Sequence, residues 1–215
     1  MSDEISTKLI LASASPRRKE LLEQIGVSFD ICSADIDESP YAAELPVNYV
    51  LRMAKSKAYE VWSQLKQSAQ LSLAERVIIL ASDTGVVLDG SIFGKPDTKT
   101  EFEGMMAQLS GCYHEVMTSV HVLELALSSD QPVLDIKSEK AFMVNTKVKF
   151  KSLCASEIEA YWLTGEPKDK AGGYGIQGKG AIFIERIEGS YSSVVGLPLN
   201  ETAEMLVQYG IGVWS

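Results

Sequence analysis

The longest regular pattern of apolar residues in the chain begins at Pro46. From there, apolar side chains recur at helical spacing over about five turns, at Val47, Val50, Leu51, Ala54, Ala58, Val61 and Leu65. This spacing predicts a long helix that buries one face, followed by a polar loop over residues 64–74. Arg52, Lys55 and Lys57 lie off the apolar stripe. We expect solvent to cover Arg52 and Lys55.

Other stretches carry the apolar runs that are typical of strands. Residues 77–81 (V-I-I-L-A) are apolar without a break, which predicts a central strand covered on both faces. Residues 114–125 and 136–150 are long and β-rich, and we expect them to pair as an antiparallel hairpin across the polar segment 128–132. The remaining predicted strands are residues 8–12, 29–32, 86–88, 92–93 and 181–187, with a turn at Asp89-Gly90 between the third and fourth of these.

Shorter helical patterns alternate with the strands. Ser15 is a suitable N-cap, Pro16 suits the first helical position, and Gly26 suits a left-handed stop, so a helix is predicted between them. The other predicted helices are residues 98–109, a segment capped by Ser156 and stopped at Gly165, and residues 200–209. The glycine-rich segment 170–178 predicts a loop that approaches a ligand closely or takes positive φ angles.

The first turn of the helix after Ser15 carries an unusual charge. Arg17, Arg18 and Lys19 stand where free N–H groups and the helix dipole already present partial positive charge. Three cations there are unfavourable unless an anion lies among them, and a helix start with added guanidinium groups is a phosphate site. The alternative is a solvated charged turn whose long side chains lie over the core.

Composition and charge narrow the classes of protein that remain. The 215 residues are 46% hydrophobic and 23% charged, as in ordinary globular proteins, and the net charge is -9. An acidic chain argues against binding to a nucleic-acid polymer, which needs a basic face, but it leaves room for a small polyanionic ligand. No apolar run is long enough to span a membrane.

The N-terminus and the cysteines bear on location. Residues 1–8 (M-S-D-E-I-S-T-K) are polar and acidic, so we expect no signal peptide. Cys32, Cys112 and Cys154 are isolated and odd in number, which predicts small buried side chains in a reducing compartment. These features favour the cytoplasm. The oligomeric state stays open, with a homodimer as one alternative.

Cations and carboxylates recur at the predicted strand ends and loops. Asp83 and Thr84 directly follow the buried strand 77–81, at the end where α/β folds place their chemistry. Cations can neutralise a triphosphate, while carboxylates can hold a divalent metal or a nucleophilic water. The set therefore indicates nucleotide hydrolysis; its members are Arg17, Arg18, Glu38, Lys57, Asp83 and Lys95.

Other reaction classes fit the residues less well. Asp83-Thr84-Gly85 resembles half of an aspartic-protease site, which would need a second carboxylate from a symmetric dimer. His114 and His121 lack the spacing of a zinc protease. A Ser-His-Asp triad stays open on spacing, although the chain has no G-x-S-x-G elbow, and it has neither a Walker A loop nor a G-x-G-x-x-G fingerprint.

Five short motifs stand in one order along most of the chain. Together they resemble the Maf family of nucleotide pyrophosphatases, and the loop with Tyr174 to Gln177 is similar to the branch that acts on dTTP and UTP. The motifs are Ser13-Ala14-Ser15-Pro16-Arg17-Arg18 with Glu20-Leu21-Leu22, Asp83-Thr84, Gly94-Lys95-Pro96, Leu109-Ser110-Gly111, and the segment 170–178.

The resemblance implies a fold and a reaction. The fold would be α/β, with an elongated mixed sheet flanked by helices and a single domain over residues 1–215 whose two lobes surround a cleft. The reaction would split a nucleoside triphosphate between its α- and β-phosphates, giving the monophosphate and pyrophosphate.

The resemblance also implies roles for individual residues. Asp83 corresponds to the proton acceptor, and Glu38, Lys57 and Lys95 match further active-site positions. We expect Glu38 and Asp83 to hold Mg²⁺ or Mn²⁺. The implied substrate-binding residues are Ser13, Ser15, Arg17, Arg18, Thr84 and Gln177, of which Arg17, Thr84 and Gln177 match positions that tune the choice of nucleotide.

Two points stay open at this stage. Gly85 departs from the family pattern, which usually has a branched apolar residue there, and we expect it to loosen the strand end that positions Asp83. A non-catalytic nucleotide-binding regulator of cell division is the alternative function. A binder could lose its carboxylates, whereas this chain retains Glu38, Asp83 and Lys95, which favours an enzyme.

Overall fold

One mixed sheet runs through the described chain. The computed structural model describes residues 7–68, 76–127 and 134–214, and its strands are β1 (Thr7–Leu11), β2 (Asp30–Ile31), β3 (Arg76–Leu88), β4 (Ser91–Phe93), β5 (Tyr113–Leu127), β6 (Leu134–Phe150) and β7 (Ile184–Glu188). Their order is β2-β1-β3-β5-β6-β7, with β4 paired to β3. β1 is parallel to β2 and β3, whereas the other pairs are antiparallel. The α/β fold class is confirmed.

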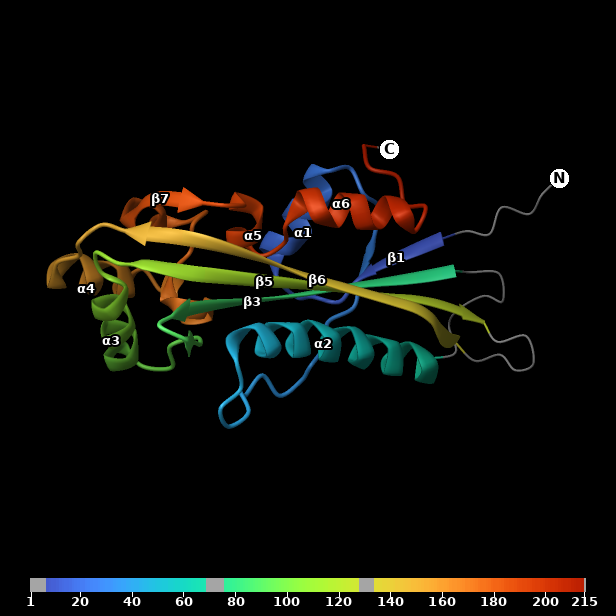
Figure 1. Cartoon of the computed structure of the whole chain (residues 1–215), viewed down its shortest axis with the longest axis horizontal. Coiled ribbons are helices and arrows are strands. Elements are labelled where there is room, and N and C mark those ends of the chain that lie inside the picture. Colours follow the sequence, from blue (N-terminus) through green and yellow to red (C-terminus); the bar gives the residue numbers. More distant parts are fainter. Residues whose placement is uncertain (1–6, 69–75, 128–133, 215) are drawn as a thin grey trace.

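Helices cover both faces of this sheet (Figure 1). They are α1 (Pro16–Gln24), α2 (Pro46–Ser68), α3 (Lys99–Leu109), α4 (Ala155–Leu163), α5 (Tyr191–Val195) and α6 (Leu199–Gln208), with 3-10 turns η1 (Glu166–Asp169), η2 (Ala171–Gly173) and η3 (Lys179–Phe183). The long helix α2 runs along one face, α1 and α6 cover the other, and α3 and α4 lie at the far end of the β5–β6 hairpin. Within the described residues, no helix has the length and apolarity needed to cross a membrane.

Side chains of β3 alternate between these two helical layers. Ile79 and Ala81 pack in the cluster that contains Ala58 of α2, whereas Ile78 and Leu80 pack in the cluster that contains α1 and α6 side chains. A strand repeats its side-chain direction every second residue. Asp83 therefore faces α2, and Thr84 faces the α1 side of the sheet.

Two predicted boundaries were wrong because polar residues were taken as breaks. β3 is one strand from Arg76 to Leu88, so Asp83 lies within it rather than after its end. The helix from Pro46 continues to Ser68, so the expected loop starts at least five residues after Gln64. The predicted hairpin partners 86–88 and 92–93 do pair, as β3 and β4.

Helix ends agree with the glycine signals better than with the serine signals. Gly26 and Gly165 take φ angles of 69° and 75° beyond α1 and α4, as their stop positions require. Ser156 is not the cap of α4, because Cys154 takes that place and Glu157 accepts a hydrogen bond from its backbone N–H. Residues 181–183 belong to a 3-10 turn, and β7 begins only at Ile184.

Two expectations about surface and burial were also wrong. Cys112 and Cys154 are exposed and Cys32 is half-buried, because they lie after a turn, at a helix cap and just after the short edge strand β2. Arg52 is half-buried, since its guanidinium bonds Glu44 at 2.6 Å and lies over the Tyr41 ring. The expected loop at 128–132, most of the one at 64–74 and the acidic N-terminus at 1–6 lie outside the described residues.

Candidate active site

A cavity of about 870 Å³ opens beside the middle of β3. It is lined by parts of α1, the acidic loop after β2, α2, β3, the turn after β4 and the glycine-rich segment. All ten residues singled out from the sequence lie on its wall, namely Ser13, Ser15, Arg17, Arg18, Glu38, Lys57, Asp83, Thr84, Lys95 and Gln177. The structure therefore brings the whole predicted set together.

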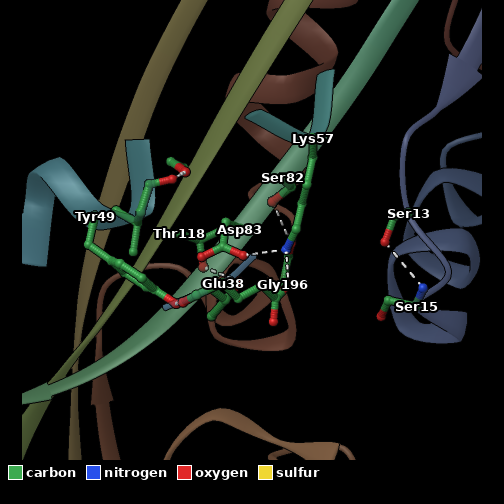
Figure 2. Close-up of polar contacts among 12 residues, drawn as sticks. Ser13, Ser15, Glu38, Tyr49, Lys57, Ser82, Asp83, Thr118 and Gly196 are labelled. Atoms are coloured by element: carbon green, nitrogen blue, oxygen red, sulfur yellow. Dashed lines mark hydrogen bonds and ion pairs between the residues drawn. The ribbon is translucent and has the colours of Figure 1, made fainter. Parts of the chain in front are cut away.

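An ion-pair chain crosses the α2 side of the cavity. Nζ of Lys57 lies 2.6 Å from Oδ1 of Asp83 and 2.7 Å from Oε1 of Glu38. Figure 2 shows this nitrogen between the two carboxylates. Nζ of Lys95 lies 3.0 Å from the other oxygen of Glu38. Two acids from different elements thus converge on one cation.

The two carboxylates differ in their electrostatic surroundings. Burial raises the pKa of Asp83, which is 7% exposed, although Lys57 and Arg18 act against this shift. Half-burial would also raise the pKa of Glu38, but its hydrogen bonds and charge interactions with Lys57 and Lys95 prevail and lower that pKa to about 2. Asp83 is therefore the stronger base of the pair.

Arg18 is bound to the protein on the opposite side of β3. Its Nε donates to the carbonyl of Gly196 at 2.9 Å, and its Nη2 donates to Oγ1 of Thr84 at 3.3 Å. Thr84 in turn lies 3.0 Å from Oγ1 of Thr118. Among the described residues, the guanidinium of Arg17 makes no hydrogen bond or ion pair, so it is available to a ligand.

The start of α1 is open towards the cavity. Ser15 occupies the N-cap position, as predicted, but its side chain accepts no capping hydrogen bond. Its backbone N–H donates to Oγ of Ser13 at 3.1 Å instead (Figure 2). A helix start whose first N–H groups have no side-chain cap retains donors for an anion.

Gln177 enters the cavity from the glycine-rich segment. Its side chain is exposed, and its amide has no hydrogen-bond partner among the described residues. Three residues earlier, the hydroxyl of Tyr174 lies 2.7 Å from Nε2 of the buried His114. The segment is thus anchored beside Gln177 while the amide itself stays free.

Two supporting residues, Tyr49 and Ser82, were missed by the sequence analysis. The hydroxyl of Tyr49 donates to the carbonyl of Glu38 at 2.9 Å and ties the acidic loop to α2 (Figure 2). Ser82 donates to the same Gly196 carbonyl that Arg18 contacts. Their partners lie 11 and 114 positions away along the chain, and no local pattern marks such residues.

The donor set fits a divalent cation bound mainly by oxygen. Glu38 and Asp83 already place one oxygen each within 2.7 Å of a common positive charge, the Lys57 ammonium group. Within the described ranges no cluster of three or more acidic, histidine or cysteine side chains is placed to hold a metal. Two carboxylates suit Mg²⁺, which commonly keeps waters and substrate phosphates as its other ligands.

Comparison with known families agrees with this geometry. A family model described as "Maf-like protein" matches residues 8–209. The chain belongs to the Maf family. The Maf match includes every residue on the cavity wall, from Ala12 to Val195.

Curated relatives of this Maf chain are similar over nearly their whole length. A protein of Colwellia psychrerythraea named dTTP/UTP pyrophosphatase is 48% identical, over 97% of this chain and 92% of its own. A protein of Methylobacillus flagellatus with the same name is also 48% identical, over 96% and 95%. One of Hahella chejuensis, again so named, is 43% identical, over 97% and 95%.

Proposed function

We propose that this chain hydrolyses dTTP and UTP between the α- and β-phosphates, releasing the nucleoside monophosphate and pyrophosphate. The relatives named dTTP/UTP pyrophosphatase support the substrate class. The observation that carries the reaction is the contact of Lys57 with both Asp83 and Glu38 inside a cavity that further cations line. Such a site can neutralise a polyphosphate and activate water beside it.

We assign the phosphate chain to the part of the cavity wall that carries Arg17, Arg18 and Lys95. Arg17 and the uncapped start of α1 offer N–H donors to phosphate oxygens, and Ser13 and Ser15 border that start. Arg18 stabilises the same edge by holding Thr84 and Gly196. Lys95 is 54% exposed at its side chain and can turn from Glu38 towards the leaving pyrophosphate.

Asp83 is assigned the part of proton acceptor. Its carboxylate takes a proton from the attacking water as the oxygen bonds to the α-phosphorus, and the bond from that phosphorus to the bridging oxygen breaks. Burial raises the pKa of Asp83, which makes this carboxylate a better base than a solvated one. Lys57 holds Asp83 in place through the 2.6 Å contact.

Glu38 and Asp83 are the residues we assign to Mg²⁺ or Mn²⁺. The metal, when bound, would neutralise phosphate charge and lower the pKa of a bound water. Lys57 keeps the two carboxylates turned towards one point, so they are already oriented before a metal binds. Lys95 supports the same arrangement from the exposed side of Glu38.

The base is assigned to the end of the cavity that carries Gln177. A carboxamide offers one acceptor and two donors, which matches the donor and acceptor on the Watson–Crick edge of uracil or thymine. Arg17 and Thr84 are the other residues to which we assign nucleotide choice, and both share the wall with Gln177.

The deciding experiment incubates purified protein with a panel of nucleoside triphosphates and Mg²⁺ or Mn²⁺. It then measures the release of pyrophosphate and of orthophosphate separately. Pyrophosphate from dTTP and UTP, with weak release from purine nucleotides, is the expected result. Orthophosphate alone would move the attack to the γ-phosphate and contradict the assigned bond. Binding of nucleotide without turnover would favour a regulator instead.

A further inference from the structure

The loop that carries Gln177 is held from behind by one carboxylate. Glu166, the first residue of η1, accepts a hydrogen bond from the backbone N–H of Lys179 at 2.9 Å through Oε2. Its Oε1 accepts another from the N–H of Gly180 at 3.2 Å. The carboxylate therefore binds the backbone two and three residues after Gln177.

Tyr161 of α4 extends this contact to the other side of Gln177. Its hydroxyl donates to Oε1 of Glu166 at 2.7 Å and accepts from the backbone N–H of Gly175 at 3.1 Å. Tyr161 is buried, at 4% exposure. Glu166 and Tyr161 together thus hold both ends of the segment 175–180, with contacts two residues before Gln177 and two and three residues after it.

The glycines of this segment are explained by the same two side chains. A Cβ added to Gly178 would overlap both carboxylate oxygens of Glu166, and one added to Gly180 would lie 2.6 Å from the Tyr161 hydroxyl. Neither glycine has a positive φ angle. Close approach to Glu166 and Tyr161, rather than a special backbone angle, is what requires glycine there.

Glu166 and Tyr161 are themselves absent from the cavity wall, whereas Gln177 is on it with a free amide. We propose that Glu166 and Tyr161 are positioning residues that set the selectivity for pyrimidine bases by fixing the backbone around Gln177. This inference rests on the proposed function, since it takes Gln177 to meet the base. It assigns the two residues no contact with substrate.

Glu166→Gln and Tyr161→Phe test the proposal. Glutamine keeps the size of the Glu166 side chain, but only its amide oxygen can accept a hydrogen bond, whereas both carboxylate oxygens of Glu166 do so. Phenylalanine removes the Tyr161 hydroxyl, which bridges Glu166 and Gly175. Glu159→Gln is the matched control, because Glu159 lies on α4 with Tyr161 and, among the described residues, pairs only with Lys99, at 2.9 Å. Thermal unfolding of each variant separates local effects from a general loss of structure.

The kinetic readout compares ligands with and without a base. We expect each test variant to raise the KM for dTTP about tenfold and to lower the preference for dTTP over dGTP about tenfold, as loss of one well-placed hydrogen bond does. Inhibition by inorganic tripolyphosphate, which has no base, should stay within about twofold of wild type. An unchanged preference, or an equal loss of tripolyphosphate binding, would overturn the positioning role.

A second readout does not depend on turnover. Amide hydrogen exchange over residues 175–180 should become faster in Glu166→Gln than in the Glu159→Gln control, and unchanged exchange would overturn the proposal. If wild type hydrolyses neither dTTP nor UTP, the proposed function fails on its own. The positioning role is then tested by calorimetry, which compares the binding of two non-hydrolysable analogues, α,β-imido-dUTP and α,β-methylene-ATP. If the variant and the wild type prefer the pyrimidine analogue by the same factor, the positioning role is overturned.

Discussion

The ammonium nitrogen of Lys57 lies 2.6 Å from Oδ1 of Asp83, and this contact holds a carboxylate in the middle of a buried strand. Asp83 faces α2, and Lys57 comes from that helix with only 11% of its side chain exposed. Burying a charge without a partner is costly. The helix and the strand thus define the position of the acid before any ligand arrives.

Asp83→Asn should lower turnover by about two to four orders of magnitude, the usual loss when a general base is removed. The amide has the same size and can still contact Lys57, so we expect the fold to persist. Steady-state release of pyrophosphate from dTTP measures the effect, and circular dichroism checks the fold. Asp35→Asn serves as control, because Asp35 is an exposed acid that does not line the cavity. Turnover near the wild-type value in Asp83→Asn would remove Asp83 from the mechanism.

Lys57→Met should destabilise the protein by about 3 kcal/mol at pH 7.5, because it leaves a buried carboxylate without its closest cation. Mg²⁺ should recover part of this loss, since the metal would take the place of the ammonium charge between Glu38 and Asp83. Thermal unfolding with and without Mg²⁺ measures both effects. Lys55→Met, which removes an exposed lysine of the same helix, is the control. A variant that gains no more from Mg²⁺ than wild type would contradict the assigned metal ligands.

The sequence predicted which residues form the candidate site, but it did not predict that Asp83 lies within a strand. Most of the charged residues were identified at a predicted helix start, loop or strand end, and Lys57 was identified within a predicted helix, off its apolar stripe. All of them line one cavity. Asp83 looked like the residue after a strand, because Ser82, Asp83 and Thr84 interrupt an apolar run. In the structure, three partners far away in sequence satisfy these groups, namely Gly196, Lys57 and Arg18. A strand can then continue through polar residues.

The contacts behind the glycine-rich segment could not be predicted for a similar reason. Glu166 lies in sequence near other charged residues, and its two backbone partners are 13 and 14 positions away. The glycine run signalled either close approach or positive φ. Only the structure distinguishes Gly172 and Gly173, which have positive φ angles, from Gly178 and Gly180, which do not.

Gly85→Val should destabilise the protein by about 1–3 kcal/mol, although a branched residue is what the family pattern has there. Gly85 faces α2, and a Cβ placed on it would lie 3.1 Å from Cγ1 of Val50. Val50 therefore fills the space beside Gly85 that a side chain would take. Packing against Val50 argues against the expectation that Gly85 loosens the strand around Asp83. Adding Val50→Ala to Gly85→Val should recover most of the loss.

Urea unfolding of both single variants and the double variant measures this coupling as a double-mutant cycle. The cycle also isolates the effect from the intrinsic gain of replacing glycine in a strand. Additive free energies of unfolding would show that Gly85 and Val50 do not compete for the same space.

His114 should make folding stability fall as the pH drops below about 6.5. Burial lowers the pKa of His114 to about 4, so the folded chain keeps this imidazole neutral. Between pH 6.5 and 4 the unfolded chain binds more protons at this site, and linkage therefore favours unfolding as the pH falls. The loss from this one group should reach about 2 kcal/mol between pH 7.5 and pH 5.

Urea unfolding across that pH range isolates the contribution of His114 when it is compared with His114→Gln, the variant that cannot titrate. The variant is expected to be less stable at pH 7.5, because it disturbs the contact with Tyr174, but to lose less on acidification. Parallel stability curves for the two proteins would contradict a neutral buried His114.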